Sequence, residues 1–180
     1  MPSPVKMSHI VLQTNQIAAM RDWYIKVLDA ELVQESDFIS FISYDEEHHR
    51  IAFLNPGPLG KNEEGRVGFN HIAFSFASLK DLLSVYEKLK RDGIMPNWCV
   101  NHGPTTSLYY KDPDGNGVEI EVDNFPDVRD CKAYMRSPAF VGNQRGFEFD
   151  PEEMARRLRA GVPERELLDR ANLEKEKAPA

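Results

Sequence analysis

The sequence contains an internal repeat, which restricts the fold more than any other feature. The segment SHIVLQTNQIAAMRDWYIKVLDAEL, which begins at Ser8, aligns without a gap with NHIAFSFASLKDLLSVYEKLKRDGI, which begins at Asn70. His9 then falls on His71, at an offset of 62 residues (71 − 9). Each copy has the pattern of a short apolar strand, a polar joint and an amphipathic helix. The sequence therefore predicts two equivalent modules.

Both predicted helices carry apolar residues at helical spacing. In the first copy these are Ile17, Met20, Tyr24, Val27 and Leu28, and in the second they are Leu79, Leu82, Leu83, Tyr86 and Leu89. Gly93 is expected to end the second helix, because glycine readily takes the left-handed conformation that often follows a helix.

The second halves of the two copies also match. SFISYDEEHHRIAFLN and SLYYKDPDGNGVEIEV align without a gap when Asp45 meets Asp112, at an offset of 67 (112 − 45), and both read as strand, turn, strand. The larger offset places about five extra residues in the loop PNWCVNHGPTT, which is rich in Pro, Gly and Asn. The predicted order is thus β-α-β-β-β twice, in modules 5–56 and 67–124 joined by NPGPLGKNEEG. This is an α+β fold, in which we expect the modules to form a curved mixed sheet.

The repeat ends near residue 124, and residues 125–180 are expected to form a C-terminal helical extension to the 5–124 domain. DVRDCKAYM fits a short helix, and DPEEMARRLRAGV fits a helix that begins at its Asp-Pro-Glu-Glu start. PERELLDRANLEKEKAPA is strongly charged, so it is expected to fray or to pack on a partner chain.

Composition excludes several classes of function. The 180-residue chain has a net charge of −7, which argues against a nucleic-acid-binding surface. Its apolar runs are far shorter than the roughly 18–20 residues that span a bilayer, and its N-terminus has no signal-peptide core. Cys99 and Cys131 show no paired spacing, so neither a disulfide framework nor a thiolate metal site is indicated. A cytoplasmic protein without membrane or nucleic-acid partners is expected.

The two repeated histidines are the first sign of chemistry. A single histidine in an apolar strand is more often a core residue than a ligand, but His9 and His71 occupy the same position of two equivalent strands. In a duplicated sheet with a pseudo-twofold axis, equivalent positions can converge on that axis. Two imidazoles that meet in this way would form a metal site suited to Zn, Fe, Ni or Cu.

The strand GVEIEV offers a carboxylate for the same site. Glu119 and Glu121 lie on one face of this predicted strand, and under the offset of 67 they match Ala52 and Leu54. Two histidines and one carboxylate could form a facial triad in which Ala52 leaves a fourth corner bare. Such a site with open positions is typical of non-haem Fe(II) enzymes.

The segments SHIVLQT, NHIAF and DPDGNGVEIEV resemble the vicinal oxygen chelate superfamily, which includes glyoxalase I, fosfomycin-resistance enzymes and bleomycin-binding proteins. The resemblance covers residues 5–124 and implies that His9, His71 and Glu119 bind the metal. Within the superfamily the sequence is most similar to type I extradiol ring-cleaving dioxygenases, including those related to dihydroxybiphenyl dioxygenase.

This resemblance also implies roles for two further residues. Tyr109 lies ten residues before Glu119 and is expected to hydrogen-bond a substrate oxygen. His102, in NHGPTT, is the candidate acid or base toward the diol, and His48 is the alternative.

Other residues are candidates for substrate binding. Strand parity places His48 and Arg50 on the face of Ala52, where they could line the mouth of the site, although a solvent-exposed histidine pair is the simpler interpretation. Arg50 could receive a substrate carboxylate, and Trp98 could form a wall of the substrate pocket.

The function implied is that of a non-haem Fe(II)-dependent extradiol dioxygenase, an oxidoreductase that cleaves a catechol-type aromatic diol with O2. Mn, Zn or Ni are alternative metals, and a homo-oligomer such as a dimer is expected. One alternative is a glyoxalase-like lyase or isomerase, although those sites commonly have a fourth protein ligand where Ala52 lies. Another is a non-catalytic small-molecule-binding protein, in which the metal ligands would be expected to be lost.

Overall fold

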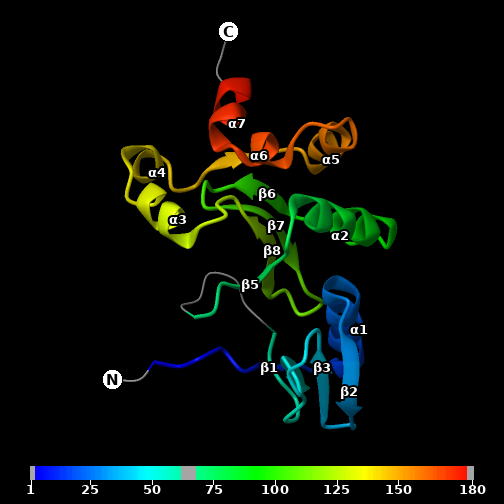
Figure 1. Cartoon of the computed structure of the whole chain (residues 1–180). Coiled ribbons are helices and arrows are strands. Elements are labelled where there is room, and N and C mark those ends of the chain that lie inside the picture. The colour runs from blue at the N-terminus through cyan, green and yellow to red at the C-terminus, as the bar shows by residue number, and fades with distance from the viewer. Residues whose placement is uncertain (1–2, 62–67, 178–180) are drawn as a thin grey trace. The chain divides into compact units, whose positions relative to one another are not determined.

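A computed structural model describes residues 3–61 and 68–177. The chain divides into two compact units. Unit 1 comprises residues 1–69 and 112–116, and unit 2 comprises residues 70–111 and 117–180 (Figure 1). The strand-connecting turn 112–116 is thus grouped with the first module, although the strands on either side of it belong to the second.

Unit 1 consists of one helix and a four-stranded mixed sheet. Its elements are β1 (Ile10–Gln13), α1 (Ile17–Leu28), β2 (Glu31–Glu35), β3 (Ile39–Ser43) and β4 (Ile51–Leu54). The strand order is β1-β4-β3-β2, with β1 and β4 parallel and the other neighbours antiparallel. Four of the five apolar residues expected to define the helix face are buried, namely Met20, Tyr24, Val27 and Leu28.

Unit 2 repeats this arrangement and adds one strand. Its first elements are β5 (His71–Ser75), α2 (Leu79–Arg91), β6 (Trp98–Asn101), β7 (Thr105–Lys111) and β8 (Gly117–Asp123). The sheet order is β5-β8-β7-β6-β9, where β9 (Phe147–Glu148) comes from the C-terminal extension. The five apolar residues predicted for the face of α2 are all buried.

The ends of α2 follow from local chemistry. Ser78 caps the helix by accepting a hydrogen bond from the Asp81 backbone N–H. Gly93 has a φ of 76°, the left-handed conformation expected just after a helix.

The internal repeat is reproduced in the strand pairing. Val11 pairs with Ala52 in unit 1, and Ala73 pairs with Glu119 in unit 2, as the offsets of 62 and 67 require. The gapless alignment of the two hairpins is one residue out of register on one side of the turn. Paired residues 42 and 51 are nine positions apart (51 − 42), whereas 110 and 118 are eight apart (118 − 110). The second turn is therefore one residue shorter, and Tyr109 rather than Leu108 lies opposite Glu119.

Asp112 organises this second turn. Its Oδ1 accepts hydrogen bonds from the backbone N–H groups of Asp114 (3.0 Å) and Asn116 (2.8 Å). Its Oδ2 accepts one from the buried Tyr24 hydroxyl at 3.1 Å. Gly115 has a φ of 83°, which explains the glycine at that position. The DPDGN motif is thus a carboxylate-anchored turn that joins β7 to β8.

The C-terminal extension is helical, as predicted. It contains α3 (Val128–Tyr134), α4 (Pro138–Gly142), α5 (Pro151–Arg159), α6 (Glu164–Leu168) and α7 (Arg170–Lys177). The last charged stretch does not simply fray, because Leu167 and Leu173 are buried. The Tyr86 hydroxyl of α2 also donates a 2.5 Å hydrogen bond to Glu152 in α5. The extension is therefore part of the core of unit 2. None of the helices within residues 3–61 and 68–177 has the length and apolar character needed to cross a membrane.

Candidate active site

Two of the three predicted metal ligands lie side by side in unit 2. Glu119, near the middle of β8, is only 6 % exposed, and His71 begins the neighbouring parallel strand β5. The His71 Nε2 atom lies 3.0 Å from the Glu119 Oε2 atom. Gly117 faces His71 in the ladder, and a Cβ there would lie 2.9 Å from the His71 Cβ. The glycine therefore gives the imidazole the space it needs.

A hydrogen bond fixes which nitrogen of His71 carries the proton. The His71 Nδ1 atom lies 2.7 Å from the Asn70 side-chain oxygen, which can only accept, so Nδ1 is the donor. In the neutral ring, Nε2 then presents a lone pair toward the Glu119 carboxylate. Two lone pairs this close repel each other unless a proton or a metal cation lies between them. The donor types and the orienting partner therefore fit a divalent metal ion.

Tyr109 lies directly across the sheet from Glu119. Its ring contacts His71 edge to face, with ring centroids 5.4 Å apart. Burial raises the pKa of the Tyr109 hydroxyl, and the nearby Glu119 charge raises it further. The phenol thus stays protonated near neutral pH and can donate a hydrogen bond.

His102 joins this group from the loop between β6 and β7. Its Nε2 lies 3.0 Å from the Tyr109 hydroxyl oxygen. Burial lowers the pKa of His102, while hydrogen bonds with the backbone of residues 144 and 145 and the Glu119 charge oppose that shift. The imidazole is therefore mostly neutral near pH 7, as a general base must be.

Trp98 borders the same cluster. Its ring centroid lies 5.3 Å from that of His102 and 5.0 Å from that of Tyr109. Its indole N–H donates to Glu148 in β9 at 2.9 Å, which fixes the ring. Unit 2 thus brings together five of the predicted site residues, namely His71, Trp98, His102, Tyr109 and Glu119.

Glu121 lies on the same face as Glu119 and is also buried, at 8 % exposure. Ser75 donates a hydrogen bond to its Oε1, and its Oε2 has no hydrogen-bond partner among the described residues. Burial raises the pKa of this carboxyl. Glu121 is therefore an interior acid close to the candidate site, and it is not placed at a solvent-exposed rim.

In unit 1, His9 lies just before β1, and its closest aromatic partner is a residue that sequence reasoning did not select. The ring of His49 lies 4.4 Å from that of His9, measured between centroids, and 4.9 Å from that of Phe41. Burial lowers the pKa of His49, and electrostatic interactions with the His9 and His48 rings lower it further. In the sequence, the only sign of a role for His49 was its position next to His48. The His48 side chain is 69 % exposed.

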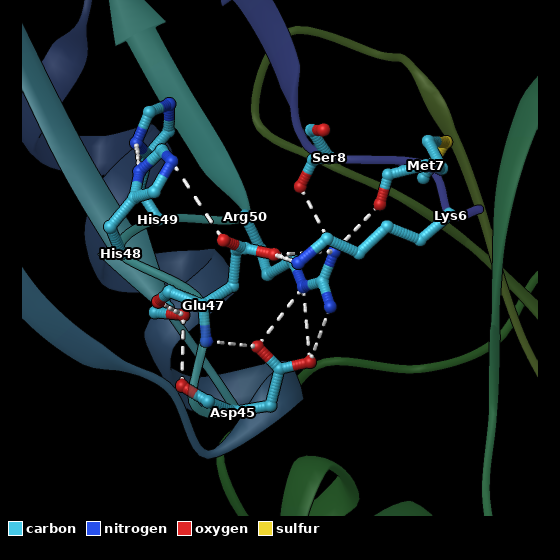
Figure 2. A network of polar contacts seen from close by, with 9 residues as sticks. Lys6, Met7, Ser8, Asp45, Glu47, His48, His49 and Arg50 are labelled. Carbon is cyan, nitrogen blue, oxygen red and sulfur yellow. Dashed lines mark hydrogen bonds and ion pairs between the residues drawn. The ribbon is translucent and has the colours of Figure 1, made fainter. Parts of the chain in front are cut away.

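Arg50 is already engaged by its own unit (Figure 2). Its guanidinium donates three hydrogen bonds to the Asp45 carboxylate at 2.9–3.0 Å. It also donates to the backbone oxygens of Met7 (2.7 Å) and Ser8 (3.0 Å), which directly precede His9. Its expected role in receiving a substrate carboxylate stays a prediction. In this structure it holds the segment that leads to His9.

The complete ligand set likewise stays a prediction. Within residues 3–61 and 68–177, no three His, Cys, Asp or Glu side chains gather to form a metal-binding group. His71 and Glu119 form a pair within unit 2, whereas His9 belongs to unit 1.

Two βαβββ modules with equivalent strand pairing define a class of duplicated α+β proteins. The sequence model of one family of this class, described as the Glyoxalase/Bleomycin resistance protein/Dioxygenase superfamily, matches residues 6–120. The chain therefore belongs to this superfamily, as the sequence motifs predicted. The α+β class and the helical extension are confirmed as well.

Similar proteins support this assignment at two levels. Biphenyl-2,3-diol 1,2-dioxygenase 2 of Rhodococcus globerulus is 48 % identical over 164 residues, which cover 91 % of this chain and 86 % of that protein. Biphenyl-2,3-diol 1,2-dioxygenase 3 of the same organism is 45 % identical over 168 residues, with 92 % and 88 % covered. The structure of lactoylglutathione lyase from Agrobacterium tumefaciens matches with a TM-score of 0.55, covering 67 % of this chain and 96 % of that one. At 18 % identity this last likeness concerns the fold alone.

Proposed function

We propose that this protein is a non-haem Fe(II)-dependent extradiol dioxygenase that cleaves a catechol-type aromatic diol with O2. The relatives at 48 % and 45 % identity are both dioxygenases, which supports this function over a lyase, an isomerase or a non-catalytic binder. The structural observation that carries the proposal is the imidazole–carboxylate pair of His71 and Glu119 beside the hydrogen-bonded pair of Tyr109 and His102.

The proposed metal ligands are His71, Glu119 and His9. The first two are supported by their distance and by the proton position on His71. His9 is supported by the repeat, since it is the counterpart of His71 in the other module. When bound, the metal would polarise the diol oxygens and offer a position for O2. Imidazole and carboxylate donors with open positions favour Fe(II), and Mn, Zn and Ni are the alternatives for metal analysis.

The protein residues around this pair have separate tasks in the proposal. Tyr109 donates a hydrogen bond to a substrate oxygen, because its raised pKa keeps its proton in place. His102 is neutral and accepts the proton of a diol hydroxyl, which it can return later in the cycle. Trp98 offers an aromatic face against which a substrate ring can pack.

Turnover under controlled oxygen tests the function. The protein is loaded anaerobically with Fe(II) and mixed with a panel of catechols that includes biphenyl-2,3-diol. We expect O2 uptake together with a yellow ring-fission product, and no product without O2. Retention of zinc together with O2-independent conversion of a glyoxalase-type substrate would contradict the proposal.

The two adjacent histidines of unit 1 give a matched comparison. His49→Ala removes a partly buried ring that packs on the candidate ligand His9, whereas His48→Ala removes a largely exposed ring. Outer partners of metal ligands typically contribute about 10- to 100-fold in affinity or activity. We therefore expect a loss of this size in kcat/KM for His49→Ala and a clearly smaller one for His48→Ala. The reverse order would instead favour His48 as the acid–base residue.

The proposed partners are a small aromatic diol and O2, in a cytoplasmic protein. We also propose a homo-oligomer, which the apolar surface of unit 1 supports. The strand β2 lies at an edge of its sheet and exposes Leu32 and Val33, and Phe38 is exposed nearby in the chain. Apolar groups on a sheet edge favour association with another chain.

A further inference from the structure

The loop that carries His102 is held both by its own module and by the C-terminal extension. This loop joins β6 to β7, and Asn124, directly after β8, donates from its side chain to the Gly103 backbone oxygen and from its backbone N–H to the Pro104 backbone oxygen, both at 2.8 Å. The His102 backbone N–H donates to the Thr105 backbone oxygen at 2.9 Å, and Gly103 has a φ of 104°. The extension adds to these contacts, since His102 also forms hydrogen bonds with the backbone of residues 144 and 145.

Arg170, the first residue of α7, makes the central contact. Its Nη1 donates to the His102 backbone oxygen at 3.1 Å and to the Tyr134 hydroxyl at 3.0 Å. Its Nη2 donates to the Asn143 backbone oxygen at 2.6 Å, and its guanidinium lies over the Phe147 ring at 5.1 Å. The Arg170 side chain thus connects the His102 loop to three segments of the extension, at Tyr134, Asn143 and Phe147.

The burial of this arginine is costly. Arg170 is only 9 % exposed, and none of the ion pairs found among residues 3–61 and 68–173 involves it. Its hydrogen-bond acceptors are two carbonyl oxygens and a phenol oxygen. Removing a charge from water is costly unless its contacts compensate, so these hydrogen bonds matter for where the guanidinium lies.

Further hydrogen bonds and a packing contact hold the same loop. The Asn101 side chain donates to the Leu168 backbone oxygen at 2.8 Å and accepts from the Gly103 backbone N–H at 2.8 Å. The Tyr134 ring lies so close to Gly103 that a Cβ there would be 2.5 Å from it. The loop is thus enclosed by the end of β6, by α3 and by the α6–α7 junction.

The loop is not closely packed on every side. A cavity of about 580 Å³ lies alongside, and Gly103, Tyr134, Phe147 and Arg170 are among the residues that line it. With this space next to the loop, the hydrogen bond from Arg170 to the His102 oxygen is one of the contacts that hold the His102 backbone. The charge of Arg170 also favours the neutral form of His102, because it is one of the causes that lower the pKa of that ring.

We propose that Arg170 is a positioning residue that holds the His102 loop in its working geometry, and thereby makes the C-terminal extension part of the active site. The inference rests on the proposed function, in which His102 is the acid–base group. Arg170 touches neither substrate nor metal in this proposal and acts only through the loop. A displacement of a catalytic group by about 1 Å can lower the rate by about 100-fold.

Arg170→Met tests this directly, because methionine keeps most of the side-chain length and removes the donors and the charge. We expect kcat on a catechol substrate to fall by about 10- to 100-fold, with KM and bound metal close to the wild-type values. Arg170→Lys should recover part of the loss, since an ammonium group can still donate to the His102 oxygen. Arg165→Met, an exposed arginine in the neighbouring α6, is the matched control and should keep the wild-type kcat.

A second measurement does not depend on turnover. Amide hydrogen exchange of residues 101–105 in the metal-free proteins should be faster in Arg170→Met than in the wild type or in Arg165→Met. A wild-type kcat and unchanged exchange in Arg170→Met would overturn the inference. So would a loss that matches only the unfolded fraction in thermal denaturation, or an Arg170→Lys variant as impaired as Arg170→Met. If the wild type consumes no O2 with any catechol, the proposed function fails, and the exchange experiment still decides whether Arg170 holds the loop.

Discussion

His71→Ala is expected to reduce the metal content of the purified and reconstituted protein to a small fraction of the wild-type value. The physical reason is the loss of a lone pair that, together with the buried Glu119 carboxylate at 3.0 Å, faces the proposed metal. Loss of an outer partner of a metal ligand typically costs about 10- to 100-fold, so loss of the ligand itself should lower kcat by more than about 100-fold. Metal analysis and O2 uptake measured on the same samples check both effects.

Asn70→Ala provides a graded version of the same experiment. It leaves the His71 imidazole in place but removes the oxygen that accepts the Nδ1 proton at 2.7 Å. The ring is then free to change its tautomer and orientation, and metal affinity should weaken by about 10- to 100-fold. His48→Ala is the control for removal of an imidazole, because its exposed ring lies in unit 1, and it should retain the metal. Wild-type metal affinity in both His71→Ala and Asn70→Ala would refute the ligand assignment.

The sequence alone predicted the features of the fold that depend on local periodicity. The apolar residues of α2 recur at helical spacing, so their buried face could be read directly. The offsets between the copies agree with equivalent registers in the two sheets, since Val11–Ala52 corresponds to Ala73–Glu119. The register itself is seen only in the structure.

The turn was less predictable, because side-chain hydrogen bonds rather than apolar spacing determine its length. Asp112 anchors the second turn through the backbone N–H groups of Asp114 and Asn116. In the first turn, Asp45 instead binds the Arg50 guanidinium. Two aspartates aligned in sequence thus support turns that differ by one residue. The gapless alignment missed this difference, and so it did not show that Tyr109 lies opposite Glu119.

The sequence predicted a helical extension, but its composition did not show how the last stretch packs in unit 2. Its last stretch is rich in charge, and its buried residues are few and widely spaced. Leu167, Arg170 and Leu173 recur every three positions, and all three are buried in the structure. A spacing of three residues could have suggested that these side chains share one buried face. An arginine is rarely buried, however, so it does not fit the apolar pattern expected of such a face. Arg170 donates to backbone oxygens of residues that are distant in sequence, and only folding brings them near.

His102→Gln is expected to lower kcat by about 100- to 10,000-fold while the metal content stays at the wild-type level. Glutamine retains hydrogen-bonding capacity toward the Tyr109 hydroxyl but cannot accept and return a proton at neutral pH. Retention of metal separates this effect from the loss of a ligand in His71→Ala. A kcat within about threefold of the wild type would rule out His102 as the acid–base residue, because general acid–base catalysis is typically worth far more.

The pH dependence of the wild type gives an independent check on the same residue. Burial lowers the pKa of His102 from its usual 6.5, so the neutral base persists below that pH. The rate should therefore stay high as the pH falls to 6.5, decline only in more acidic solution, and lose this decline in His102→Gln. A rate that already halves above pH 7 through a group absent from His102→Gln would contradict the neutral, buried state of this histidine.

Tyr109→Phe tests whether the two residues act together. Tyr109 and His102 share a 3.0 Å hydrogen bond, and the β7–β8 ladder places Tyr109 opposite Glu119. Residues that act as one unit show losses that do not multiply. The double variant His102→Gln/Tyr109→Phe should thus lose clearly less activity than the product of the two single losses. Independent, fully multiplicative losses would mean that Tyr109 and His102 serve separate steps, and that the bond between them does not contribute to turnover.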